Sequence, residues 1–261
     1  MGLTPDRGQG GRTERRCWLP AAGRSLTILD IATGAVLRSW DDATFPAPLD
    51  GSVAAFPGDT GNIATRAFVT DADGVIWRID LSAPDPDDWE VTAFYDMFHG
   101  LGYAAGQPAF GAPVLSTDED GNVVIIHGTG DIDRLENPGV RNRIVSLTER
   151  VTFDTTTGEA TNVESRLNWE ITLEPGELVT GPLELFNGEV FFGTFTSTTD
   201  LTNACAFGFS RIWGVQYVES LPATGTNPAP ALETNPGSGV QDATNLGPGD
   251  APGLDNRLVL G

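Results

Sequence analysis

Two stretches of the chain repeat one pattern: Pro113–Thr129 reads PVLSTDEDGNVVIIHGT, and Pro182–Thr194 reads PLELFNGEVFFGT. Each begins with proline, runs through apolar residues, turns at a glycine, returns through a second apolar run and ends in Gly-Thr. Asn187-Gly188 is a strong signal for a type I′ hairpin, because that turn needs a positive φ at both central residues. The two stretches therefore predict two antiparallel hairpins built to the same plan.

The same plan extends outward in both directions. Each hairpin is followed, after a variable loop, by a run that begins with arginine and an aliphatic residue, at Arg143-Ile144 and at Arg211-Ile212. Arg66–Leu81 has the same strand–turn–strand centre, and Ser25–Trp40 resembles the end of a preceding unit. Repeated units of roughly 40 to 70 residues, each with three or four antiparallel strands, are typical of a β-propeller. The sequence therefore predicts an all-β fold, a partial β-propeller of about four antiparallel blades.

Composition shifts divide the chain into three parts. Residues 1–20 are polar and rich in arginine and glycine, which predicts a disordered N-terminal segment, and residues 21–220 hold the β-propeller portion. Residues 221–261 form a disordered tail rich in proline and glycine, or a linker to a missing blade that begins at Arg257–Leu260. Two interpretations stay open: a piece of a larger propeller cut at both ends, or a complete small propeller with a flexible tail.

The composition also bears on partners and location. The 261 residues include 15 basic and 36 acidic side chains, for a net charge of −21. Such a surface repels phosphate backbones, so we expect no nucleic-acid partner. No apolar run approaches roughly 18 residues, so no membrane span is predicted, and the first residues lack the apolar region of a signal peptide. Cys17 and Cys205 are too few for a disulfide scaffold, and whether they pair stays open.

The apolar runs predict the core of the blades. Glu90–Leu101 carries apolar residues at spacings that would fit one or two helical turns. Whether this segment is helical stays open. The residues expected at buried blade positions are Trp77, Val124, Ile125, Ile144, Phe191, Phe192, Ile212 and Val215.

Several segments resemble, in order, the C-terminal β-propeller of the PilY1/PilC family, which comprises assembly and adhesion proteins at the tip of type IV pili. The similar family patterns are YVGDxxGxLWRFDLS, QPITxxPxV, VxFGTG, and a segment running from GWxxxLxxGE to FxTF, after which a cysteine often follows. The corresponding segments here are Phe68–Ser82, Gly106–Val114, Val124–Gly130 and Trp169–Thr194, followed by Cys205. The resemblance covers about residues 25 to 220.

The resemblance implies a non-catalytic role in pilus biogenesis, surface adhesion or calcium-linked control of pilus retraction. It implies a location at the cell surface, outside the cell or in the periplasm. The implied partners are pilus tip or minor pilin proteins, and a surface ligand for adhesion.

A calcium loop of the form DxDxDGxxD precedes the YVGD strand in that family. The corresponding residues here are Pro57–Thr65, in which Asp59 stands at a ligand position and Thr65 replaces the final aspartate. Asn62 is a further oxygen donor in the loop. Calcium prefers six to eight hard oxygen ligands, several of them carboxylates. We therefore expect a degenerate loop that binds calcium weakly.

A second acidic segment, Asp118–Asn122, stands at the tip of a predicted hairpin. Asp118 and Asp120 are calcium candidates there, because carboxylates are the ligands that calcium prefers. The alternative is a solvated turn, since aspartate and asparagine suit turns for backbone reasons alone. His99 and His127 are not at a metal-binding spacing, and His127 is expected at the end of a strand.

Two other function classes stay open beside the pilus role. Leu29–Arg38 resembles the AxDxxTGxxxW blade motif of quinoprotein dehydrogenases, which bind pyrroloquinoline quinone, although Arg38 and Ser39 intervene before Trp40. The other alternative is a propeller scaffold that assembles envelope proteins. The sequence contains no recognisable pair of a nucleophile and its general base, so we expect no intrinsic enzymatic activity.

Overall fold

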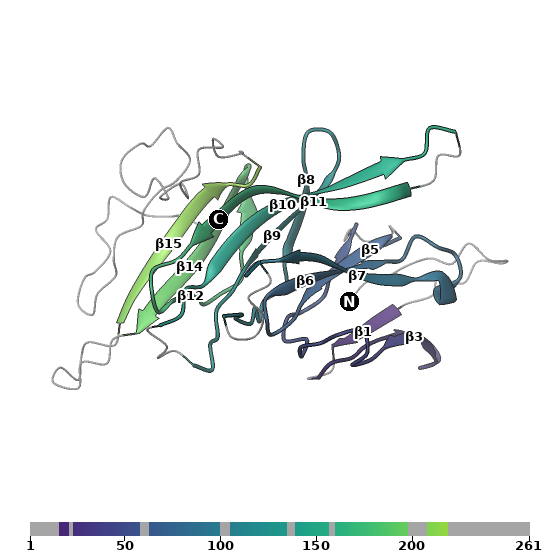
Figure 1. Ribbon diagram of the computed structural model, residues 1–261, viewed down its shortest axis with the longest axis horizontal. Helices are drawn as coiled ribbons and strands as arrows, with labels where there is room; N and C mark the ends of the chain where they lie inside the picture. The colour runs from purple at the N-terminus through teal and green to yellow at the C-terminus, as the bar shows by residue number, and fades with distance from the viewer. Residues whose placement is uncertain are drawn as a thin grey trace. The chain divides into compact units, whose positions relative to one another are not determined.

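The structure of the chain is a computed structural model, which describes residues 16–20, 23–57, 63–99, 105–134, 139–156, 160–197 and 208–218. Apart from one short 3-10 helix at Pro86–Asp88, its regular elements are β-strands (Figure 1). The strands are β1 (Arg16–Pro20), β2 (Leu26–Asp30), β3 (Val36–Trp40), β4 (Ala54–Phe56), β5 (Arg66–Thr70), β6 (Val75–Asp80), β7 (Glu90–Asp96), β8 (Val114–Thr117), β9 (Val123–Gly128), β10 (Arg143–Phe153), β11 (Ala160–Thr172), β12 (Glu177–Val179), β13 (Glu184–Phe186), β14 (Glu189–Ser197) and β15 (Gly208–Gln216).

The described strands form four sheets, each of which we call a blade. Their strand orders are β1-β2-β3, β4-β5-β6-β7 and β8-β9-β10-β11, and in the fourth β14 pairs with β12, β13 and β15. Antiparallel strand pairs occur in all four blades: β1 with β2, β5 with β6, β9 with β10 and β14 with β15. The prediction of an all-β fold with about four antiparallel repeats is confirmed.

An aspartate holds the turn of three of the hairpins. In the β5–β6 turn, Oδ1 of Asp71 accepts two backbone N–H groups of the turn, at 3.0 and 2.9 Å. Gly74 follows with a φ of 81°, a backbone conformation that costs glycine nothing and strains other residues. Asp30 and Asp118 accept backbone N–H groups in the β2–β3 and β8–β9 turns in the same way.

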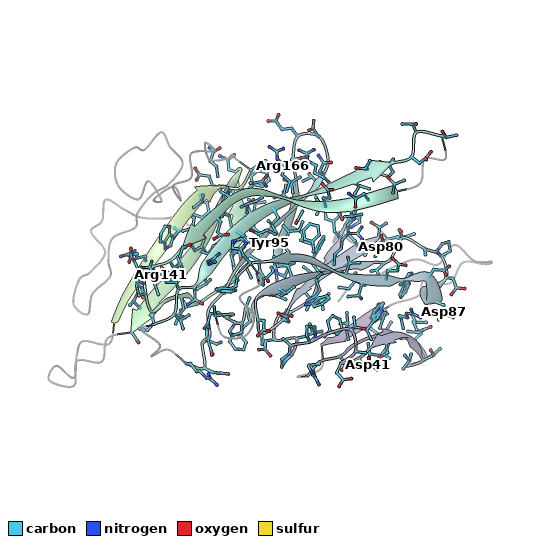
Figure 2. The ribbon with its side chains drawn as sticks, viewed as in Figure 1. Asp41, Asp80, Asp87, Tyr95, Arg141 and Arg166 are labelled. Carbon is cyan, nitrogen blue, oxygen red and sulfur yellow. The ribbon has the colours of Figure 1, made fainter. Side chains whose placement is uncertain are left out.

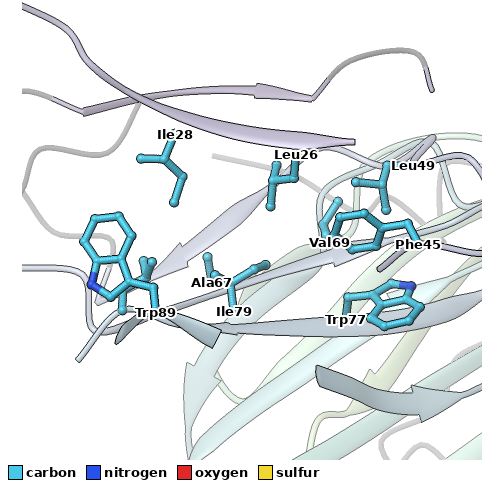
Figure 3. Packing of buried hydrophobic residues seen from close by; sticks show 10 residues of the cluster. Leu26, Ile28, Phe45, Leu49, Ala67, Val69, Trp77, Ile79 and Trp89 are labelled. Carbon is cyan, nitrogen blue, oxygen red and sulfur yellow. The ribbon is translucent and has the colours of Figure 1, made fainter. Parts of the chain in front are cut away.

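The described contacts divide the chain into two compact units, residues 1–115 and 116–261. The first unit holds the blades β1–β3 and β4–β7, whose facing side chains form one apolar cluster (Figure 3). Leu26 and Ile28 of β2 face Ala67 and Val69 of β5 across it, and Trp89 closes one end. Burying this apolar surface is the main favourable term in the folding of the unit.

The second unit holds the blades β8–β11 and β12–β15, apart from the first two residues of β8. Every residue of β9 is buried, so this strand is covered on both faces. Along β14, Val190, Phe192 and Thr194 are buried and alternate with half-buried residues, as a strand with one covered face requires. The core of this unit lies on β9, β10 and the covered face of β14 and β15.

Most of the expected core positions are buried, but Phe191 and Ile212 are half-buried. Both lie on the face of β14 and β15 opposite to the one that carries Phe192 and Trp213, because successive side chains of a strand alternate. The positions confirmed as buried are Trp77, Val124, Ile125, Ile144, Phe192 and Val215.

Two local expectations differ from the structure. Residues 1–20 were predicted to be disordered, but Arg16–Pro20 form β1, because the backbone of β2 has a free edge that an antiparallel strand satisfies. A short helix was a possibility for Glu90–Leu101, but Glu90–Asp96 form β7, the outer strand beside β6. Residues 221–261, the predicted tail, and Cys205 lie outside the described residues.

Candidate functional site

The four calcium candidates fall into two groups. Asp59 and Asn62 lie outside the described residues. Asp118 and Asp120 lie at the tip of the β8–β9 hairpin, as predicted.

The Asp118 carboxylate is engaged in holding its own turn. Its Oδ1 accepts the backbone N–H groups of Asp120 and Asn122, at 3.1 and 2.8 Å. The side-chain amide of Asn122 donates to both carboxylate oxygens, at 3.0 and 2.9 Å. With 8% of this side chain exposed, a calcium ion would have to replace several of these donors in order to bind here.

Arg150 on β10 supplies positive charge to the same hairpin tip. Its guanidinium nitrogens lie 3.8 Å from Oδ2 of Asp118 and 3.9 Å from Oδ2 of Asp120. Burial alone would raise the pKa of the Asp118 carboxyl, but the hydrogen bonds from Asn122 and the charge of Arg150 outweigh it and lower the pKa. Among the described residues, no three His, Cys, Asp or Glu side chains converge as metal ligands.

An open pocket of about 650 Å³ lies beside this hairpin tip, within the second unit. Arg150 and the neighbouring Arg166 belong to it, and Figure 2 shows Arg166 on the ribbon of β10 and β11. Arg150 and Arg166 lie on one face of that ribbon, because Arg166 pairs with Thr148, two residues before Arg150. The pocket is lined by Asp118, Glu119, Asp120, Arg150, Arg166, Asn187, Gly188, Gln216, Tyr217 and Val218.

Four hydrogen bonds hold the part of the pocket wall that Gln216 and Tyr217 form. The indole N–H of Trp169 donates to the carbonyl of Gln216 at 2.8 Å, and Ser146 Oγ donates to the carbonyl of Tyr217. The Tyr217 hydroxyl donates to the carbonyl of Thr117 at 2.8 Å, and its backbone N–H donates to Gly188. Residues from both blades of the second unit are therefore tied together at the pocket.

Two buried side-chain networks have structural roles. Trp77 donates its indole N–H to Oδ2 of Asp71, at 2.9 Å. In the last blade, Trp213 donates to Thr194, which in turn donates to the buried carboxylate of Glu177. Each network satisfies polar groups that would otherwise be costly to bury.

The other motifs noted in the sequence are also placed. Asp30 and Thr33 of the quinoprotein-like segment are engaged in the β2–β3 turn, where both side chains accept backbone N–H groups. His127 lies near the end of β9, fully buried, with no hydrogen-bond partner for either ring nitrogen among the described residues. Burial lowers the pKa of His127 to about 4, which keeps the ring neutral.

Three residues of the pocket, Arg150, Arg166 and Tyr217, were not predicted from the sequence. Each arginine stands in a strand whose side chains alternate between two faces. That alternation is only a weak signal that the two arginines share a face. Tyr217 contacts Thr117, which lies 100 residues earlier in the sequence, and no local sequence pattern predicts that contact.

Comparisons with known proteins give a structural likeness only. No family model matches the chain, and no curated protein matches its sequence. Among solved structures, the C-terminal domain of Pseudomonas aeruginosa PilY1 superposes with a TM-score of 0.57 and 13% sequence identity. That match covers 92% of this chain and 64% of the other, so the chain spans less than two thirds of that domain.

A second similar structure is the β-propeller domain of Cps50 (Swd1) from Myceliophteria thermophila, with a TM-score of 0.39 and 14% identity. It covers 94% of this chain and 57% of that domain. The likeness to the PilY1 domain shows a shared propeller fold. Among the described residues, no helix is long and apolar enough to span a membrane.

Proposed function

We propose that this chain is a non-catalytic β-propeller module that acts in type IV pilus biogenesis, surface adhesion or control of pilus retraction. The observation that carries the proposal is the likeness of its fold to the PilY1 C-terminal domain over 92% of the chain. The order of the PilY1/PilC-like segments along the sequence supports it independently of the superposition. On this proposal the protein works at the cell surface or in the periplasm.

The proposed partners are pilus tip or minor pilin proteins. The net charge of −21 would steer a basic face of such a partner toward this chain, and salt would weaken the encounter. Association rates that fall steeply as salt is added would therefore support a charge-guided contact.

The proposal of a non-catalytic role rests on the acidic and histidine side chains that could take part in catalysis, because these side chains are engaged in the fold. Asp71, Asp118 and Glu177 accept hydrogen bonds that hold turns and strands, and His127 is buried in the core. Asp30 and Thr33 likewise serve a turn. Incubation with pyrroloquinoline quinone and an electron-accepting dye should give no turnover of alcohols, and reproducible turnover would support the dehydrogenase alternative.

Calcium belongs to the proposal as a weak ligand. Asp59 and Asn62 supply few ligands, and Asp118 already has donors and a neighbouring guanidinium. Calorimetry in physiological salt should give no tight site. A single micromolar site abolished by Asp59→Ala would show that the loop is intact and this part of the proposal wrong.

The experiment that tests the pilus role is deletion of the encoding gene in its own organism. We expect fewer pili in the sheared surface fraction and weaker adhesion, both restored by the wild-type gene. Normal piliation and normal adhesion after deletion would contradict the proposal. Normal pili together with loss of other envelope proteins would favour the assembly scaffold.

A further inference from the structure

We propose that the pocket beside the β8–β9 tip binds a neutral carbohydrate, through the hydroxyl groups of a sugar ring. The pocket belongs to no site predicted from the sequence except at Asp118 and Asp120, which form one side of it. Its volume of about 650 Å³ is in the range of small-molecule sites. The proposal does not depend on the pilus role, because it concerns the ligand chemistry of one unit.

The charges in the pocket argue against an ionic ligand of either sign. Asp118, Glu119 and Asp120 bring three carboxylates, while Arg150 and Arg166 bring two guanidinium groups. An anion would meet the carboxylates and the overall charge of −21, and a cation would meet the arginines. A ligand without net charge avoids both penalties.

The hydrogen-bonding groups in the pocket suit hydroxyl groups. Guanidinium groups only donate, ionised carboxylates only accept, and the amides of Asn187 and Gln216 do both. A sugar hydroxyl donates one hydrogen bond and accepts others, so neighbouring hydroxyls can bridge an arginine and a carboxylate. Asp120, with 78% of its side chain exposed, is the carboxylate most open to such a ligand.

Arg150 and Arg166 have guanidinium N–H groups that can donate hydrogen bonds to a ligand. The contacts of Arg150 with Asp118 and Asp120, at 3.8 and 3.9 Å, are longer than hydrogen bonds. Arg166 is exposed on β11 and lies beside Arg150 on the same face of the sheet. Hydrogen bonds to charged groups are the stronger kind, which favours these two residues as the main contacts.

Hydrogen bonds within the protein hold the part of the wall that Gln216 and Tyr217 form. Tyr217 is held by its hydroxyl on Thr117 and by its backbone on Gly188 and Ser146, so its half-buried ring has a fixed place. Gln216 is held by the indole of Trp169. A fixed wall lowers the entropic cost of ordering side chains around a ligand.

The test uses the whole chain and a panel of defined sugars. The panel is methyl α-mannoside, methyl β-galactoside, glucose and N-acetylglucosamine, with N-acetylneuraminic acid and calcium chloride as charged probes. Saturation-transfer NMR and titration should show at least one neutral sugar binding with a dissociation constant of about 1 mM, typical of a weak, open site. The charged probes should not compete with it.

Variants locate the site. Arg166→Thr and Asp120→Ala alter exposed side chains and should weaken the neutral sugar about tenfold, the value of one charge-assisted hydrogen bond. Arg134→Thr and Asp87→Ala change similarly exposed residues outside the pocket and should leave binding unchanged. Circular dichroism confirms that each variant is folded.

Three outcomes overturn the proposal. The first is no binding of any neutral sugar up to about 50 mM, far above the expected dissociation constant. The second is tighter binding of N-acetylneuraminic acid or calcium in the pocket, which would assign an ionic ligand. The third is sugar binding that Arg166→Thr and Asp120→Ala leave unchanged, which would place the site elsewhere.

Discussion

Lowering the pH should destabilise this protein through His127, and replacing that residue should remove the effect. The ring lies fully buried in β9, next to Val145 of β10 in the sheet, and neither nitrogen has a described hydrogen-bond partner. Burial lowers the pKa of His127 from 6.5 to about 4. In His127→Leu, an apolar side chain of similar size replaces the ring, so stability at neutral pH should be equal or higher.

The size of the effect follows from the two pKa values. The unfolded chain takes up a proton near pH 6.5, but the folded chain resists it until about pH 4, so the unfolded state binds more protons between them. Stability is therefore fully present above pH 6.5 and falls as the pH drops toward 4. At about pH 4.5 the loss is about 2.5 kcal/mol relative to neutral pH.

Urea unfolding followed by tryptophan fluorescence, at about pH 7.5 and about pH 4.5, measures this difference. Acidic groups titrate in both proteins, so the change specific to His127 is the difference between wild type and His127→Leu. His99→Asn is the matched control, because His99 is exposed and asparagine tolerates its positive φ. An equal pH dependence of wild type and His127→Leu, or an NMR titration of His127 near 6.5, would refute the reasoning.

Two further substitutions test the packing of the second unit by urea unfolding. Thr194→Val should cost about 1 to 3 kcal/mol, because it leaves Glu177 and the Trp213 indole without their shared partner; a neutral effect would mean that the network contributes nothing. Gly130→Ala should cost more than about 2 kcal/mol, because its new Cβ would collide with the backbone of β12, whereas Gly181→Ala has open space and should change little. Equal effects of the two alanines would contradict the close approach at Gly130.

The hairpins were predictable because their signals are local. Asn187-Gly188, Asp73-Gly74 and Asp120-Gly121 stand between apolar runs, and each of these turns is formed in the structure. The strand β11 was not predicted, although the apolar residues Val163, Leu167, Trp169 and Ile171 all stand at odd-numbered positions of its sequence, as one face of a strand would.

The pocket was not predictable from local pattern. Its shape depends on the register of β10 against β11, which shifts between Ser146 and Leu147. It also depends on the contact of Tyr217 with Thr117, which joins distant parts of the sequence. The acidic tip at Asp118 was visible in the sequence, but the guanidinium of Arg150 beside it was not, and that group changes which ligands the tip favours.

The pilus role is tested most directly by measuring where the protein is found. Quantitative mass spectrometry of the sheared surface fraction can compare pilus-producing cells with cells that lack the major pilin. We expect this chain to be enriched with pili in the first and strongly depleted in the second, at equal total cellular amounts. Equal amounts in both sheared fractions, or absence from both, would contradict a role at the pilus.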